Sequence, residues 1–235
     1  MVNSEHTSRQ YDAELESVRE RVLMMGELVG KQVRLAIDAL SRGDVEQIGH
    51  IIAEDHRVNA LEVGIDESCT QIIARRQPTA VDLRMVMMII KTITDLERIG
   101  DEAKKIALAA KNLSQRKNLT LPRFDKINHV ADLTLDMLHQ SLEAFAKLDI
   151  STVAQVIRQD EEVDEEFRTV LRYLVSFMIE DPRTISSVLE ILFVAKSIER
   201  IGDHAKNMSE YVVYMVKGRD VRHITVEEIE REVQK

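Results

Sequence analysis

Hydrophobic residues recur at helical spacing along most of the chain. In the segment 14–40, for example, Val18, Val22, Met25 and Val29 all fall on one face of a helix. The same pattern predicts further helices over residues 44–77, 79–113, 123–147, 149–180 and 184–217. Gly43, Pro78 and Pro182 stand at the breaks between them, as expected of residues that end helices. The pattern therefore predicts an all-α protein with six long helices.

The second half of the chain repeats the landmarks of the first. They recur at a nearly constant offset: Asp44 and Asp149 lie 105 residues apart, Asp55 and Asp160 also 105, Pro78 and Pro182 104, and Glu97 and Glu199 102. The offset changes only across turns between helices, where short deletions are tolerated. A repeat of this length predicts a tandem duplication of one structural unit. Each unit holds three of the six helices and closes into a three-helix bundle.

This duplication gives the expected domain organisation. A flexible N-terminal tail covers residues 1–11, the first three-helix bundle covers 12–113, and a linker covers 114–122. The second bundle covers 123–217, and a charged C-terminal segment, 218–235, forms a loose helix or a tail. Asp44 and Asp149 are expected to cap the second helix of their respective bundles.

Two nearly identical polar octamers carry the strongest chemical signal. Residues 97–104 read ERIGDEAK and residues 199–206 read ERIGDHAK, so that only Glu102 and His204 differ. Each octamer places two carboxylates four residues apart, which puts them one above the other on a helix, with β-carbons about 6 Å apart. Leu96, Gly100 and Ala103 share the neighbouring stripe, which is the natural core face.

Stacked carboxylates repel each other unless a positive charge lies between them. A hard cation with oxygen ligands, such as iron, manganese, magnesium or calcium, is the simplest candidate. Two carboxylates do not complete a coordination sphere, so the second helix of each bundle must add oxygens. His204 points about 140° away from Glu199 and is not counted as a ligand. The candidate metal ligands are Glu97, Asp101 and Asp55 in the first half, and Glu199, Asp203, Asp160 and Asp164 in the second.

The competing interpretation is a solvated polar face without metal. Asp101 then forms ordinary surface ion pairs with Lys104 and Lys105, and Arg98 pairs with Glu102, each worth a few tenths of a kcal/mol. The residues alone do not decide between a metal site and a solvated polar face. The repetition of the octamer favours a metal site more strongly than a single copy would.

The amino-acid composition of the chain excludes several classes of function. The net charge of −9, from 32 basic and 41 acidic residues, argues against nucleic-acid binding. The single cysteine, Cys69, excludes a disulfide within the chain and fits a reducing, cytoplasmic compartment. No apolar run approaches the roughly 20 residues of a membrane span, so contact with a membrane is expected only through partners. Phosphate loops, zinc-type Cys/His spacing and nucleophile elbows are absent, and the sequence makes no case for an enzyme.

Two further motifs accompany the octamers. Residues 75–80 read RRQPTA and are followed by DLR at 82–84, and residues 216–223 read VKGRDVRH. With these features the chain resembles the PhoU family over its full length. The resemblance implies a cytoplasmic protein of two similar three-helix bundles, often a homodimer, that negatively regulates phosphate uptake and the phosphate regulon. It also implies two partners, which the protein links when phosphate is plentiful: the ATPase subunit of the phosphate ABC transporter and the regulon's sensor histidine kinase.

The resemblance also bears on the metal site. Some family members bind multinuclear clusters of iron, zinc or other metals through the E-x-x-x-D motifs, which here are Glu97 with Asp101 and Glu199 with Asp203. Acidic positions of the second helix carry over as Asp160 and Asp164. The first half has Asn59 where the second has Asp164, and this neutral amide weakens the first site.

Three hypotheses follow. The first is an adaptor-type regulator without catalysis, whose acidic clusters hold Fe, Zn, Mn or Mg. The second is a metal-storage or metal-dependent helical bundle unrelated to phosphate signalling. The third is a purely structural scaffold in which the octamers serve helix packing alone.

Overall fold

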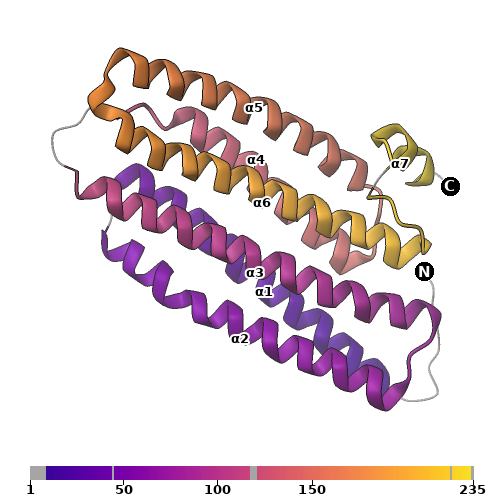
Figure 1. Cartoon of the computed structure of the whole chain (residues 1–235). Coiled ribbons are helices and arrows are strands. Elements are labelled where there is room, and N and C mark those ends of the chain that lie inside the picture. Colours follow the sequence, from indigo (N-terminus) through magenta and orange to yellow (C-terminus); the bar gives the residue numbers. More distant parts are fainter. Residues whose placement is uncertain (1–8, 44, 117–120, 223, 234–235) are drawn as a thin grey trace.

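The chain is an elongated helical protein (Figure 1). The computed structural model describes residues 9–43, 45–116, 121–222 and 224–233, and these residues form no strand. Their helices are α1 (Arg9–Arg42), α2 (Val45–Arg76), α3 (Ala80–Ser114), α4 (Asp125–Lys147), α5 (Val153–Glu180), the short 3-10 turn η1 (Pro182–Thr184), α6 (Ile185–Lys217) and α7 (Val226–Val233). The predicted all-α class and the six long helices are confirmed. None of the described helices is both long and apolar enough to cross a membrane.

The long helices form two three-helix bundles that lie side by side. Helices α1, α2 and α3 pack together, as do α4, α5 and α6, and the chain reverses direction at each connection (Figure 1). The bundles meet where α3 packs against α6 and, to a smaller extent, where α1 packs against α4. Helices α3 and α6 run antiparallel, because Lys91 lies beside Tyr211 while Asn112 lies beside Glu190. The two octamer-bearing helices therefore form the centre of the molecule.

The core follows from the predicted helix faces. Val18, Val22, Met25 and Val29 are all buried, and the apolar stripes of the other five long helices join them in one continuous cluster. Burying a side chain of this size contributes roughly 1.5–3 kcal/mol. The low aromatic content does not weaken this core, because Leu, Ile, Val, Ala and Met fill it.

Some helix ends differ from the sequence-based expectation. Helix α1 begins at Arg9 and buries Tyr11, so it starts inside the flexible tail that was expected over 1–11. Asp149 does not cap α5 directly; its carboxylate accepts hydrogen bonds from the backbone N–H and hydroxyl of Ser151, in the turn before the helix. The predicted cap Asp44 lies outside the described residues, as do residues 117–120 of the expected linker.

The segment after Gly218 is more ordered than a tail. It contains α7, which packs against α5, and it buries Val221 and Ile229 in the core of the second bundle. An ion pair between Arg158 of α5 and Glu230 of α7 adds to this contact. Of the two alternatives expected for this segment, a helix is the one observed over Val226–Val233.

Candidate functional site

The octamers lie in the middle of α3 and α6, and one face of each octamer packs in the core. Leu96, Ala103, Ile198 and Ala205 are fully buried, as the stripe geometry predicts. The glycines of the octamers provide room for neighbouring helices. A β-carbon on Gly202, for example, would lie 3.3 Å from the side chain of Thr134 on α4. The carboxylates of the octamers consequently lie at the boundary between core and solvent, beside the second helix of their own bundle.

In the first bundle, carboxylates from α2 and α3 face one another. Burial raises the pKa of Glu97, and the negative charges of Asp101, Glu62 and Asp55 raise it further. Lys104 supplies one counter-charge, since its Nζ donates to Asp55 Oδ2 at 2.6 Å. The pKa of Glu62 is raised as well, mainly by burial and then by the charge of Asp66. We call this group the first acidic cluster: Asp55, Glu62, Glu97 and Asp101.

The second bundle repeats this arrangement between α5 and α6. Loss of solvent raises the pKa of Asp203, and repulsion from Glu199 and then Asp160 adds to the shift. Two lysines provide counter-charge: Lys206 Nζ donates to Asp160 Oδ2 at 2.7 Å, and Lys196 Nζ donates to both carboxylate oxygens of Glu199 at 2.5 Å. We call this group the second acidic cluster: Asp160, Asp164, Glu199 and Asp203.

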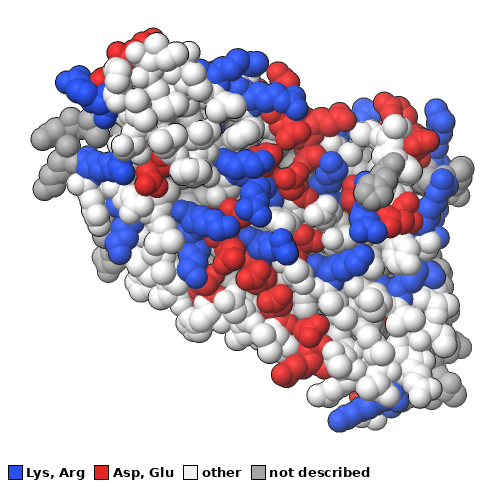
Figure 2. All heavy atoms as spheres, viewed as in Figure 1, with Lys and Arg blue, Asp and Glu red and all other residues white. Residues whose placement is uncertain are grey.

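Figure 2 shows that Asp and Glu side chains form a band across one face of the molecule, with Lys and Arg side chains among them. The carboxylates of each cluster lie close enough to raise the pKa of Glu97 or of Asp203, and this proximity agrees with the sequence-based prediction. The sequence predicted the wrong partner for Lys104, which reaches across to Asp55 on α2 instead of pairing with Asp101 along α3. Asp164 is partly exposed and lies 3.8 Å from Arg168, an exposed guanidinium one turn further along α5.

The donor chemistry of both clusters fits a hard cation. All donors are carboxylate oxygens, and their mutual repulsion would be relieved by positive charge. In the described part of the chain, however, no three Asp, Glu, His or Cys side chains are already gathered as a metal site. Binding would require Lys104, Lys206 and Lys196 to release their carboxylates. Metal binding at the seven candidate ligands thus stays a prediction.

Sequence reasoning missed a set of buried polar contacts between the bundles. Glu102 is only 2% exposed, and its Oε1 lies 2.8 Å from Nη1 of Arg200 and 2.9 Å from Nζ of Lys105. The predicted surface pair of Arg98 with Glu102 is therefore wrong. His204 Nδ1 lies 2.7 Å from Asp95 Oδ1, and both residues are buried.

One signal in the sequence could have led to these contacts. Glu102 and His204 occupy the single position at which the two octamers differ, and that position faces the other bundle in both copies. Across the interface the two copies of this position meet different side chains, since Glu102 pairs with Arg200 and His204 with Asp95. The difference between the octamers thus marks the α3–α6 interface.

Comparisons with known proteins agree with this duplicated architecture. A family model described as the PhoU domain matches residues 22–110 and again residues 127–212, once in each bundle. The chain belongs to the PhoU family. It is 45% identical to the phosphate-specific transport system accessory protein PhoU of Escherichia coli K12, over 97% of this chain and 94% of that protein. It is also 45% identical to the protein of that name from Edwardsiella tarda, over 97% of this chain and 93% of that protein.

Two solved PhoU structures share the fold. The crystal structure of PhoU from Pseudomonas aeruginosa matches with a TM-score of 0.85 and 44% identity, covering 89% of this chain and all of that one. The crystal structure of the phosphate transport system regulatory protein PhoU from Streptococcus pneumoniae matches with a TM-score of 0.82 at 28% identity, covering 90% of this chain and 99% of that one. The paired bundles are thus a PhoU architecture.

Proposed function

We propose that this chain is a negative regulator of phosphate uptake and of the phosphate regulon. The observation that carries the proposal is the 45% identity, over 97% of the chain, to a protein named as an accessory protein of the phosphate-specific transport system. In this role the chain acts in the cytoplasm as a homodimer and has no catalysis of its own. It links the ATPase subunit of the phosphate ABC transporter to the sensor histidine kinase when phosphate is plentiful, and it reaches the membrane only through these partners.

The shape and surface of the chain support an adaptor role. Ile185, Leu189 and Phe193 follow one another at four-residue intervals on α6, and they are 41%, 39% and 64% exposed. Such spacing places them on one helix face. Exposed apolar side chains that are contiguous on a rigid element are typical of protein–protein contacts. We call these three residues the α6 apolar stripe and propose that it contacts one of the two partners.

The acidic clusters serve this role as metal sites. Glu97, Asp101 and Asp55 hold the metal in the first bundle, and Glu199, Asp203, Asp160 and Asp164 hold it in the second, as a multinuclear centre of Fe, Zn, Mn or Mg. The bound metal supplies positive charge that neutralises the clusters and frees Lys104 and Lys206 from their carboxylates. Metal binding thereby changes the charge pattern of the face that a partner meets.

A phosphate-regulon reporter tests the regulatory function. In a strain without this chain, grown in abundant phosphate, the reporter is expected to switch on, and the wild-type chain restores repression. Phe193→Asp is expected to fold normally and to fail in repression, because it places a charge on the α6 apolar stripe. Val63→Asp is the matched control, since Val63 is a similarly exposed apolar residue (56%) on α2. A reporter that stays off in the deletion strain rejects the proposed function.

The alternative function, a metal-binding bundle unrelated to phosphate signalling, rests on the two acidic clusters alone. Elemental analysis of the purified protein separates it from the first proposal. The double variant Glu97→Ala with Asp101→Ala is expected to keep its helical content and to lose bound metal. If it loses metal while repression is unchanged, the alternative is favoured; if the metal content is undiminished, the ligand assignment is wrong.

A further inference from the structure

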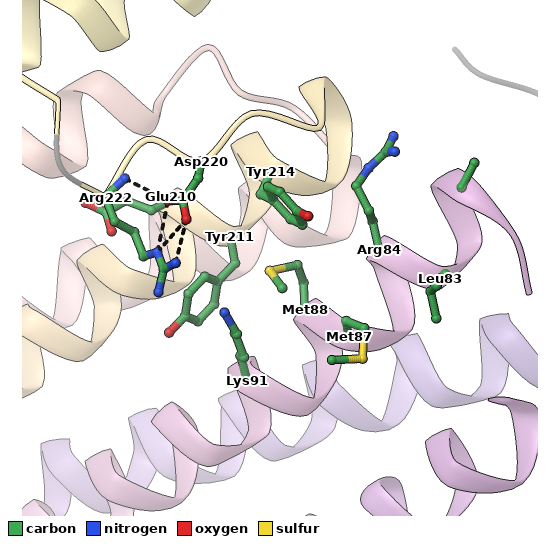
Figure 3. A pocket seen from close by; sticks show the side chains of 11 residues that line it. Leu83, Arg84, Met87, Met88, Lys91, Glu210, Tyr211, Tyr214, Asp220 and Arg222 are labelled. Atoms are coloured by element: carbon green, nitrogen blue, oxygen red, sulfur yellow. Dashed lines mark hydrogen bonds and ion pairs between the residues drawn. The ribbon is translucent and has the colours of Figure 1, made fainter.

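A cavity of about 320 Å³ lies at the end of the molecule where α3 begins and α6 ends (Figure 3). It brings together the two sequence motifs that neither the metal sites nor the core explains. The segment that follows Pro78 contributes Ala80, Leu83 and Arg84, and the segment that follows α6 contributes Asp220 and Arg222. A cavity of this volume falls in the size range of small-molecule sites.

The walls of the cavity are largely apolar and aromatic. Tyr211 and Tyr214 of α6 face Met87 and Met88 of α3 across it (Figure 3). Tyr211 is fixed in place, because its hydroxyl hydrogen-bonds to Asp95; burial and this carboxylate together raise the pKa of Tyr211. Rigid tyrosine rings and polarisable thioethers form a surface that suits a flat aromatic group.

Two cations at the cavity lack a carboxylate partner within the described part of the chain. Lys91 Nζ lies 5.5 Å from the centre of the Tyr211 ring and forms none of the ion pairs found there. Arg84 reaches over the turn at Gly218, where a β-carbon would approach its Cζ to 3.3 Å, and its Nε is buried without a hydrogen-bond partner. Unpaired cations beside an apolar surface favour an anionic group on the ligand.

The acidic residues of the cavity do not cancel these charges. Asp220 is already satisfied by Arg222, whose guanidinium donates to both of its carboxylate oxygens. Burial raises the pKa of Glu210 to about 7, although Lys206 and Arg222 oppose the shift; Asp160 and Asp220 add to it. Three cationic side chains of the cavity, Arg84, Lys91 and Arg222, stand against two carboxylates, so its net charge is positive even when Glu210 is ionised.

We propose that this cavity binds a nucleoside monophosphate. The base would stack on the tyrosine rings, as bases do on aromatic platforms in other proteins. The phosphate would accept a hydrogen bond from Lys91 Nζ, and the guanidinium of Arg84, beyond Tyr214, would add positive charge at the other side of the cavity. The volume admits one such molecule and excludes a helix or strand of a partner protein. The site is separate from the acidic clusters and does not depend on the regulatory function.

Isothermal titration calorimetry of the purified full-length chain with AMP and GMP tests the proposal. Adenosine and inorganic phosphate, titrated separately, distinguish the contributions of the base and of the phosphate. We expect saturable binding of a nucleotide, with each fragment binding at least tenfold more weakly. Lys91→Met is expected to weaken nucleotide binding about tenfold, the effect of losing one charge-assisted hydrogen bond. Lys111→Met, which removes an exposed lysine of the same helix, is the matched control and is expected to change nothing.

A second variant keeps the test decisive if Lys91→Met fails to fold. Met87 is 43% exposed, so Met87→Trp is tolerated on the surface while its indole fills the cavity and abolishes binding. Absence of binding for both nucleotides overturns the proposal. Binding that Lys91→Met and Met87→Trp leave unchanged also overturns it, because the nucleotide would then lie elsewhere. Inorganic phosphate that binds as tightly as AMP refutes the assigned role of the tyrosines.

Discussion

Replacing Glu97 by Gln provides a direct test of the acidic clusters. The substitution keeps the size of the side chain and removes one negative charge from the first acidic cluster. Glu97 lies four residues before Asp101 on the same helix and faces Asp55 and Glu62 on α2; all three charges oppose its ionisation. Without metal, removing the negative charge of Glu97 should therefore stabilise the protein.

The size of this effect follows from the charges that face Glu97. A like-charge pair at i and i+4 costs a few tenths of a kcal/mol, and the two charges across the interface add comparable amounts after screening by solvent. The free energy of unfolding is thus expected to rise by about 0.5–1 kcal/mol in the presence of chelator. For a chain of this length, such a change raises the melting temperature by roughly 1–4 °C.

Added metal should reverse the order of stability. A metal present at a hundred times its dissociation constant stabilises the wild-type chain by about 2.7 kcal/mol. Glu97→Gln loses an anionic ligand and gains less. The assay is urea denaturation followed by circular dichroism, once in EDTA and once with Mn²⁺ or Fe²⁺, with Glu67→Gln, an exposed acid on α2, as control. If the variant is less stable than wild type in EDTA, the cluster is not repulsive. If both gain equally from metal, Glu97 is not a ligand.

Three further predictions concern the remaining polar contacts and turns. Glu102→Ala should lower the free energy of unfolding by about 1–2 kcal/mol, because it removes a buried ion-pair partner, whereas exposed Arg98→Ala should have almost no effect; equal effects would contradict the assignment. Gly218→Ala should cost about 1 kcal/mol, because φ is +69° there, and Gly49→Ala, in open space on α2, should stabilise slightly; both are measured by urea denaturation. Glu210→Gln should stabilise the protein by roughly 2 kcal/mol at pH 8 and little at pH 5. The folded protein holds the proton of Glu210 more tightly than the unfolded chain does, so wild-type stability falls as pH rises from about 4.5 to 7. If the stability gained by Glu210→Gln is the same at pH 5 and pH 8, this assignment is wrong.

The sequence predicted the helices and the duplication because both depend on local patterns. The spacing of apolar residues places Leu96 and Ile198 on the core face of their helices whatever the partner, and both are fully buried. The stacking of Glu97 with Asp101 follows from helix geometry alone. Their proximity to Asp55 required only that the second and third helices of one bundle be neighbours.

Contacts between the bundles could not be predicted in the same way. Asp95 and His204 are 109 residues apart, and no periodicity within a helix indicates which charged residue will face a distant one. Glu102 looked like a surface residue, because its neighbours Asp101 and Lys105 are polar. Its burial results from the packing of α3 on α6, which depends on how two complete bundles meet.

The antiparallel contact of α3 and α6 has a consequence for which halves can pair. It is the isologous contact that two separate three-helix chains would make in a two-fold symmetric dimer. In a dimer of two first halves, Asp95 would face a second Glu102 in place of His204, and two buried acids would repel each other. In the single polypeptide this position is an acid in one copy and an imidazole in the other. The contact between Asp95 and His204 therefore favours the pairing of the two unlike halves over the pairing of two first halves.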